Sequence, residues 1–329
     1  MAIAATLIIG ILPMLFYAMI LYWIDRFEKE PIPMLVGVFL WGMVIASGGA
    51  FILNTILGET VYAVTASSSV ASIFTGAISA PFIEEGLKGL AVLLVFLFFR
   101  SEFDTPLDGI VYAGITALGF AAVENSVYIW RGYLEGGWAQ LFLLAFVRVI
   151  LVGWQHPVYT AFTGLGLAFS RMSRRLPVKI LASLGGYMLA VITHSFHNAL
   201  TEIPFFGDMT GIIGILLDWS GVVFLLAIII WTNWLERRNM VRSLREEMQN
   251  GIISPVQYRT ACSAWAQTAA RLASLFKRNY RNTNRFYQVC GELSNKKVEL
   301  AKMGNERGNQ SKIDKYRQEL ARLASMVEA

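Results

Sequence analysis

The stretch AISAPFIEEGLKGLAVLLVF, residues 77–96, combines an apolar run of membrane-spanning length with three ionisable side chains. Glu84, Glu85 and Lys88 lie in its middle, within about one helical turn of one another. About 20 residues of α-helix cross a hydrocarbon core, and a charge at that depth is costly. The stretch therefore predicts a membrane helix that carries a functional site.

The whole chain has the composition of a membrane protein. Its 329 residues are 55% hydrophobic and 16% charged, and its mean hydropathy is +0.52, above the range of soluble globular chains. We expect an all-α polytopic helix bundle with about seven transmembrane helices. The expected spans are 2–24, 33–57, 70–99, 109–130, 146–170, 178–200 and 211–235.

Basic residues in the loops predict the orientation. Loops 25–32, 100–108 and 171–179 carry Lys and Arg, whereas the alternate loops hold only Arg131. By the positive-inside rule these three loops are cytoplasmic and the N-terminus is outside. The protein is thus expected to be a multi-pass cell-membrane protein with a cytoplasmic C-terminal tail.

Residues 236–329 differ sharply from residues 1–235. The first 235 residues have 10 Lys and Arg against 14 Asp and Glu, while the tail has 18 against 9. We expect a transmembrane domain over 1–235 and a basic helical cytoplasmic domain over 236–329, broken at glycines that include Gly251 and Gly291. The tail is expected to bind anionic inner-leaflet lipid or a cytoplasmic protein, and no nucleic acid.

Six aromatic residues in the tail are sufficient for a modest hydrophobic core. Besides the two glycines named above, breaks between the tail helices are expected at Pro255 and over 304–308. These aromatics are Tyr258, Trp265, Phe276, Tyr280, Phe286 and Tyr287.

The apolar stretch 138–170 is too long for one untilted crossing, at roughly 50 Å as continuous helix. We expect residues 136–146 to lie at the outer interface, anchored by Trp138, so that the true span begins near Arg148.

Residues 77–96 contain two acidic side chains and one basic side chain, so one carboxylate has no cation of its own in this segment. A buried Glu–Lys pair can simply hold helices in register. With two glutamates, however, one can pair with Lys88 while the other faces a cavity and becomes a candidate acid or base. Pro81 is expected to open the helix locally.

Further polar residues recur in the other predicted spans. Glu124 and Asn125 lie in one span, and Glu124 needs a partner on another helix. The three histidines of the chain all lie in predicted membrane segments, and His194 has Asn198 one turn later on the same face. These histidines are His156, His194 and His197.

Depth places several of these residues in one layer of the outer half of the membrane. Counted from the expected outer boundaries, Glu84 lies about 20 Å deep, Glu124 and His194 about 9 Å, and His156 about 15 Å. Asp218 falls at similar depth, and we expect it to pair with Arg148.

Carboxylates and imidazoles around one cavity suit the activation of water for hydrolysis. The same groups also suit zinc, so a metal site and a glutamic mechanism both remain open. The chain contains neither HExxH nor GxSxG, which argues against a zincin motif and a serine nucleophile. Gly48, Gly49, Gly164, Gly166 and the pair 185–186 are interpreted as close helix packing.

Four short motifs, in order, resemble the PrsW protease family, which is related to the type II CAAX prenyl endopeptidases and bacteriocin-immunity proteins. The resemblance covers roughly residues 15–235 and includes the segment YWIDRFEKEP at 22–31. The second motif carries Glu where the prenyl endopeptidases carry His, and His197 departs from the family pattern. The motifs are Glu84-Glu85-x-x-Lys88, Phe120-x-x-x-Glu124-Asn125, His156-x-x-x-Thr160 and His194-x-x-x-Asn198.

The resemblance implies an intramembrane peptidase that cleaves a single-pass, anti-sigma-factor-like membrane protein near the extracytoplasmic face. It implies catalytic roles for Glu84, Glu85, Glu124, His156 and His194. Lys88, Asn125, His197 and Asn198 are supporting residues, and the possible zinc ligands are Glu84, Glu124, His156 and His194. Two other functions fit the same pattern: a non-catalytic immunity or scaffold protein, and a proton-coupled transporter.

Overall fold

A computed structural model describes residues 1–202, 209–305 and 308–327 of the chain, and every element in these ranges is helical. The chain forms two compact units. The first comprises Met1–Trp23, Glu30–Arg171 and Arg175–Ala227, and the second comprises Ile24–Lys29, Met172–Arg174 and Ile228–Ala329.

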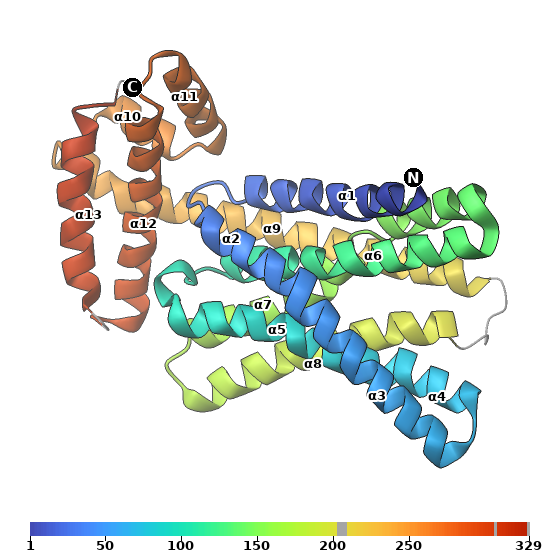
Figure 1. Ribbon diagram of the computed structural model, residues 1–329. Helices are drawn as coiled ribbons and strands as arrows, with labels where there is room; N and C mark the ends of the chain where they lie inside the picture. The colour runs from blue at the N-terminus through green and yellow to red at the C-terminus, as the bar shows by residue number, and fades with distance from the viewer. Residues whose placement is uncertain (203–208, 306–307, 328–329) are drawn as a thin grey trace. The chain divides into compact units, whose positions relative to one another are not determined.

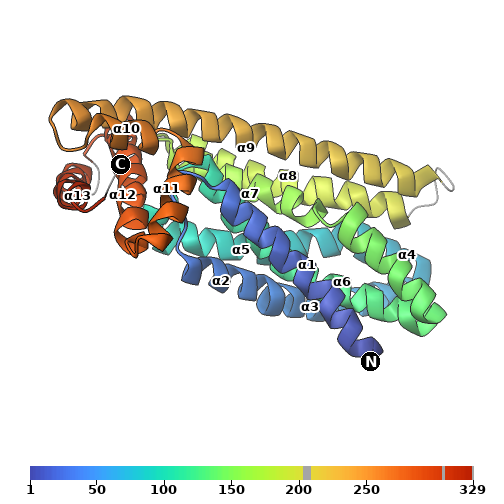
Figure 2. The same ribbon diagram turned by 90° about the horizontal axis from the view of Figure 1, so that it is seen from above.

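The first unit is a bundle of helices, in which α7 and α8 lie side by side (Figures 1 and 2). The helix α9 begins in this unit and continues into the second. The helices are α1 Ala2–Ile24, α2 Ile32–Leu40, α3 Ser47–Thr65, α4 Ser68–Phe74, α5 Ala80–Phe98, α6 Pro106–Ala145, α7 Gln155–Arg171, α8 Leu176–Glu202 and α9 Thr210–Gln249.

Large apolar side chains cover the outside of this unit. Leu12 and Phe16 of α1, for example, are more than half exposed, whereas Glu85 and Lys88 are buried. This pattern is the reverse of a soluble protein and fits a lipid environment. It confirms the predicted all-α membrane helix bundle.

Within the described residues, five helical stretches are long and apolar enough to cross a membrane. The number of crossings, expected to be about seven, stays a prediction, because α5 is not among the five and α6 and α7 fall within one stretch. The stretches are Ala2–Ile24, Ile32–Thr65, Pro106–Arg171, Leu176–Leu200 and Thr210–Gln249.

The long helical stretch Pro106–Arg171 is broken twice. Gly136 and Gly137 leave the helical conformation, and Gly137 has a φ of 64°, which favours glycine. The chain is helical again until Leu151, and α7 begins only at Gln155. The beginning of the membrane span, expected near Arg148, stays a prediction; Arg148 itself lies inside the π-helical turn Phe146–Leu151.

Glycines bring α7 into backbone contact with both α8 and α6. A Cβ on Gly166 would overlap the carbonyl oxygen of Ala182, and one on Gly186 would overlap that of Phe162. Gly164 faces Gly109 of α6 in the same way. Close packing is therefore confirmed for Gly164, Gly166 and Gly186, as is typical of small residues in membrane helices.

The other expected packing glycines behave differently. A Cβ on Gly185 or Gly48 would meet nothing within 4 Å, and one on Gly49 would meet only the Leu87 side chain, 3.0 Å away. The packing interpretation was therefore wrong for Gly48 and Gly185.

We predict that Gly166→Ala lowers the free energy of unfolding by about 1–3 kcal/mol, because the added methyl group separates α7 from α8. Gly185→Ala is the matched control on α8 and should change stability little. Thermal unfolding of both variants in one detergent tests this. Equal midpoints for both variants and the unsubstituted protein would contradict it.

The second unit is a helical domain that includes the C-terminal part of α9. Its further helices are α10 Pro255–Ala261, α11 Ala264–Phe276, α12 Tyr280–Met303 and α13 Asn309–Ala324. The last two lie side by side (Figure 1). Phe286, Tyr287, Leu293 and Leu320 are fully buried in its core, together with Phe27 from the loop after α1.

The expected helix breaks in this domain are mostly confirmed. Gly251, Gly304 and Gly308 lie between helices with positive φ. Gly291 does not end a helix, so that prediction was wrong. It lies inside α12, where a Cβ would be 2.8 Å from the carbonyl oxygen of Phe27.

The side-chain amide of Gln288 fixes the same loop to α12. It accepts a hydrogen bond from the Lys29 backbone nitrogen at 2.9 Å and donates one to the Lys29 carbonyl oxygen at 3.0 Å. Among the aromatics expected in the core, Phe286 and Tyr287 are buried and Tyr258 packs against them. Trp265, Phe276 and Tyr280 are instead exposed.

Candidate functional site

The site begins where α5 begins. Pro81 occupies the first turn of α5 and follows the π-helical turn Thr75–Ser79, so the helix is widened next to the proline, as expected. Asn198 donates a hydrogen bond to the Gly76 carbonyl oxygen in this turn, at 2.9 Å. Asn198 therefore anchors α8 to the start of α5.

Glu85 is fully buried and uses both carboxylate oxygens. Its Oε1 accepts from Lys88 Nζ at 2.5 Å and from His194 Nδ1 at 2.9 Å, and its Oε2 accepts from Thr160 at 2.8 Å. One carboxylate thus joins α5, α7 and α8. Such complete pairing is what makes a buried charge tolerable.

Glu84 is buried but paired differently. Its Oε2 has no hydrogen-bond partner among the described residues and lies 3.9 Å from His194 Nε2. The prediction that only one of the two glutamates pairs with Lys88 is therefore confirmed. Glu85 forms that ion pair, and Glu84 does not. A buried polar atom without a partner marks a place where a ligand or water fits.

The rings of His156 and His194 lie near this carboxylate and pack edge to face, with centroids 5.2 Å apart. Since Glu85 accepts from His194 Nδ1, the His194 Nε2 lone pair points away from Glu85. His156 is held by a second glutamate, because its Nε2 lies 2.7 Å from Glu124 Oε2. Its Nδ1 lies 3.4 Å from Lys88 Nζ, a longer and weaker contact.

Arg148 completes the environment of Glu124, although its expected partner was Asp218. It donates to Glu124, and its Nε donates to Asn125 Oδ1 at 3.1 Å. The signal in the sequence was its position as the only basic residue between Arg131 and Arg171. The expected pairing of Arg148 with Asp218 was wrong.

Asp218 belongs to a neighbouring group on the other side of His194. It accepts a hydrogen bond from the Tyr159 hydroxyl at 2.6 Å and lies 3.0 Å from His197 Nδ1. The Tyr159 ring stacks on His194, with centroids 5.0 Å apart. Tyr159 was not among the residues predicted for the site. His197 therefore lies beside the Glu84 cluster and contacts Asp218.

Glu84, His156 and His194 each offer one donor atom, and the three atoms lie within 4.8 Å of one another. Two histidines and one glutamate are a donor set that zinc uses in hydrolases. The unpartnered Glu84 oxygen fits this use, while His156 would have to release Lys88 or Glu124. Glu124, expected as a fourth ligand, is not in this group and instead pairs with Arg148 and His156.

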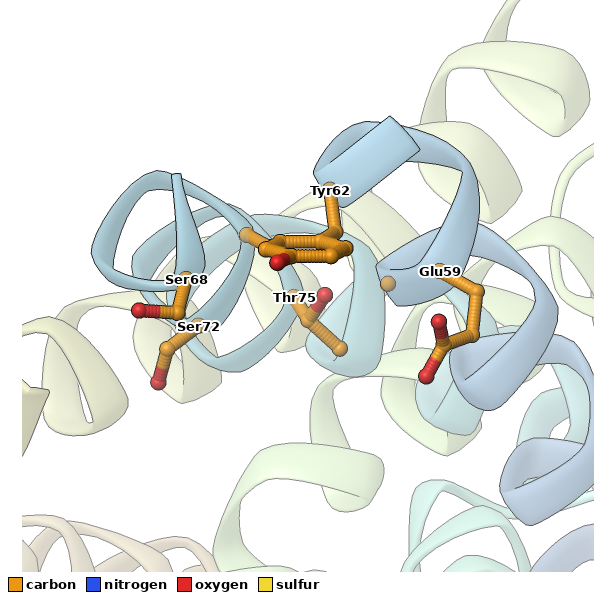
Figure 3. A pocket seen from close by; sticks show the side chains of 7 residues that line it. Glu59, Tyr62, Ser68, Ser72 and Thr75 are labelled. Atoms are coloured by element: carbon orange, nitrogen blue, oxygen red, sulfur yellow. The ribbon is translucent and has the colours of Figure 1, made fainter. Parts of the chain in front are cut away.

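A separate hollow of about 390 Å³ lies at the turn between α3 and α4, away from these residues. Figure 3 shows Glu59 and Tyr62 of α3 opposite Ser68, Ser72 and Thr75. Its lining contains one ionisable acid, Glu59, and no histidine. It therefore lacks the paired acids and imidazoles that hydrolysis requires.

Fold and site together define a helical membrane protein with buried, convergent glutamates and histidines. Residues 30–232 match the family model described as "PrsW family intramembrane metalloprotease". The chain therefore belongs to the PrsW family.

Curated relatives carry the same name. The chain is 31% identical over 143 residues to "Protease PrsW" of Geobacillus kaustophilus, covering 44% of this chain and 56% of that protein. It is 30% identical over 164 residues to "Protease PrsW" of Bacillus subtilis, covering 50% and 68%. No solved structure matches the chain.

We predict that Lys88→Met lowers the free energy of unfolding by about 3–5 kcal/mol, because it removes the cation beside the buried Glu85 carboxylate. The double variant Glu85→Gln/Lys88→Met should be more stable than Lys88→Met, since it removes the unpaired charge as well. Unfolding of the two variants in the same detergent tests this. A double variant less stable than the single one would contradict the ion-pair explanation.

Proposed function

We propose that this chain is an intramembrane peptidase that hydrolyses a peptide bond of a membrane-anchored protein at the Glu84, His156 and His194 cluster. The observation that carries the proposal is the buried Glu84 carboxylate oxygen, which lacks a hydrogen-bond partner among the described residues and belongs to a carboxylate clustered with two imidazoles. Membership in the PrsW family supports the reaction class.

We assign Glu84, His156 and His194 to the binding of a zinc-type ion, as the family description suggests. Such an ion, when bound, lowers the pKa of water and polarises a carbonyl group. Glu85 fixes the orientation of His194 through its Nδ1, and Lys88 balances the charge of Glu85. Glutamate–histidine contacts of this kind orient ligand rings in metal sites.

Glu124 is the proposed general base. Its Oε2 lies 2.7 Å from His156 Nε2 and also accepts from Arg148, so two side chains fix the same carboxylate oxygen. Glu124 takes a proton from the attacking water as the new carbon–oxygen bond forms. It then gives that proton to the peptide nitrogen as the carbon–nitrogen bond breaks, so the carboxylate is regenerated. Glu124 is partly exposed, with 22% of its side chain accessible, whereas Glu85 is fully buried.

The substrate proposed is a single-pass membrane protein of the anti-sigma-factor type. A site of buried carboxylates between membrane helices reaches a peptide bond only if the substrate enters from the bilayer. By the positive-inside rule, the basic loops support an orientation with the N-terminus outside and residues 236–329 in the cytoplasm. With that orientation, the expected depths of Glu84 and Glu124 put cleavage near the extracytoplasmic face.

We predict that Glu84→Gln lowers cleavage of a single-pass substrate in liposomes at least about 100-fold, because the amide keeps the size of the side chain but loses its charge. Glu59→Gln is the matched control, since Glu59 is an exposed glutamate of the α3–α4 hollow. The rate is followed by gel-resolved product formation. Equal loss in both variants, or none in Glu84→Gln, would contradict the assignment.

We also predict that a chelator abolishes cleavage by the unsubstituted protein and that zinc restores it. Zinc bound per chain, measured by mass spectrometry of metals, should fall in His194→Ala and remain in Glu59→Gln. Full activity in a metal-free preparation would contradict the metal assignment while leaving the peptidase proposal intact. The two proposals are thus tested separately.

A further inference from the structure

The helix α11 turns its apolar face away from the domain that carries it. Trp265 is 71% exposed, Leu272 is 56% exposed and Phe276 is 91% exposed, whereas Gln267 and Ser274 are buried. Residues 265, 272 and 276 lie on one side of the helix at the α-helical spacing, and 267 and 274 lie on the opposite side. The helix is therefore amphipathic, but its apolar face points outward and its polar face points toward the domain, which is the reverse of the usual orientation.

The buried polar side chains show that this orientation is built into the domain. Gln267 donates a hydrogen bond to the Ala261 carbonyl oxygen at 2.7 Å, and Ser274 donates to the Arg271 carbonyl oxygen at 2.6 Å. Ser263 caps the start of the helix through the Ala266 backbone nitrogen. A contiguous apolar face exposed on a soluble domain is typical of an interaction surface.

Charge identifies the kind of surface that would cover this face. Residues 248–291 contain no acidic residue, and α11 is followed at once by basic residues whose side chains are exposed. Anionic lipid headgroups attract such clusters, and a Trp or Phe beside them inserts at the boundary of headgroups and acyl chains. The exposed basic residues that follow α11 are Lys277, Arg278 and Arg281, whereas Arg285 pairs with Glu292 and Glu319.

A contact within the same unit relates the face to the end of a membrane-spanning helix. The Arg26 guanidinium lies over the Trp265 ring, 5.0 Å from its centroid. Arg26 follows the last residue of α1, Ile24, by two positions, and α1 is long and apolar enough to span the membrane. The end of such a helix lies at the membrane–water interface, so Trp265 lies near that interface too.

We propose that the outward face of α11, formed by Trp265, Leu272 and Phe276, docks on the anionic surface of the bilayer in which the chain is anchored. The docked helix lies in the plane of the interface. Its apolar side chains enter the acyl-chain boundary, and Lys277, Arg278 and Arg281 contact the headgroups. This surface is independent of the Glu84 cluster and of the proposed peptidase activity.

The test uses the full-length protein in vesicles of phosphatidylcholine and phosphatidylglycerol, with an environment-sensitive fluorophore on Leu272→Cys. Ser311→Cys on α13 is the matched control, because residue 311 is exposed and polar. The native Cys262 and Cys290 are buried, and labelling of the unsubstituted protein measures their background. Because Leu272 is exposed, its replacement leaves the core intact, which an unchanged unfolding midpoint verifies.

Acyl-chain-brominated lipid should reduce the fluorescence at position 272 by at least about twofold and leave that at 311 unchanged, while iodide in the buffer should quench only 311. The triple charge reversal Lys277→Glu/Arg278→Glu/Arg281→Glu should abolish the quenching by brominated lipid at 272.

Iodide quenching at 272 equal to that at 311 would overturn the proposal. The proposal would also be overturned if neither iodide nor brominated lipid quenched the fluorophore at position 272. That outcome would assign the face to a protein partner or to a second copy of the chain. Unchanged lipid quenching after the triple charge reversal would overturn the role of anionic headgroups.

Discussion

Burial of the Glu85 carboxylate is the constraint on which the rest of the site depends. An ionised carboxylate inside a helix bundle is tolerable only if both of its oxygens are paired with hydrogen-bond donors or an opposite charge. Lys88, His194 and Thr160 supply those partners from α5, α8 and α7. Three helices must therefore approach one point, and the positions of their other polar side chains follow from that requirement.

Close approach of the helices makes this arrangement possible. Gly166 and Gly186 let α7 and α8 touch backbone to backbone, and Gly109 and Gly164 do the same for α6 and α7. Because these contacts leave no room for side chains, His156, His194 and Glu124 project into one small volume. Glu84 enters the same volume without a hydrogen-bond partner in the described part of the chain. The bundle thus neutralises one glutamate of the pair and leaves its neighbour available.

The surface of the second unit is unusual because one of its helices, α11, exposes large apolar side chains. Its core is an ordinary apolar cluster around Phe286 and Tyr287, while α11 directs Trp265 and Phe276 outward. Exposure of large apolar groups to water is unfavourable. A domain that is covalently joined to membrane helices has a lipid surface within reach, and this gives the reversed helix a physical explanation.

Much of the bundle and of the site could be predicted from the sequence, because both depend on local composition. A buried Glu or His is expensive wherever the fold places it, so Glu84, Glu85, Glu124, His156 and His194 stand out within apolar segments. The all-α membrane fold follows from the same hydropathy, as do most of the breaks in the tail at glycine.

Only the tertiary structure decided which polar groups pair. Arg148 meets Glu124 and not Asp218, and Asp218 meets Tyr159, because partners on different helices depend on rotation and helix contact. For the same reason the outward face of α11 was not foreseen. The spacing of apolar residues shows that a helix is amphipathic. Whether its apolar side faces a core or the outside depends on how the neighbouring helices pack.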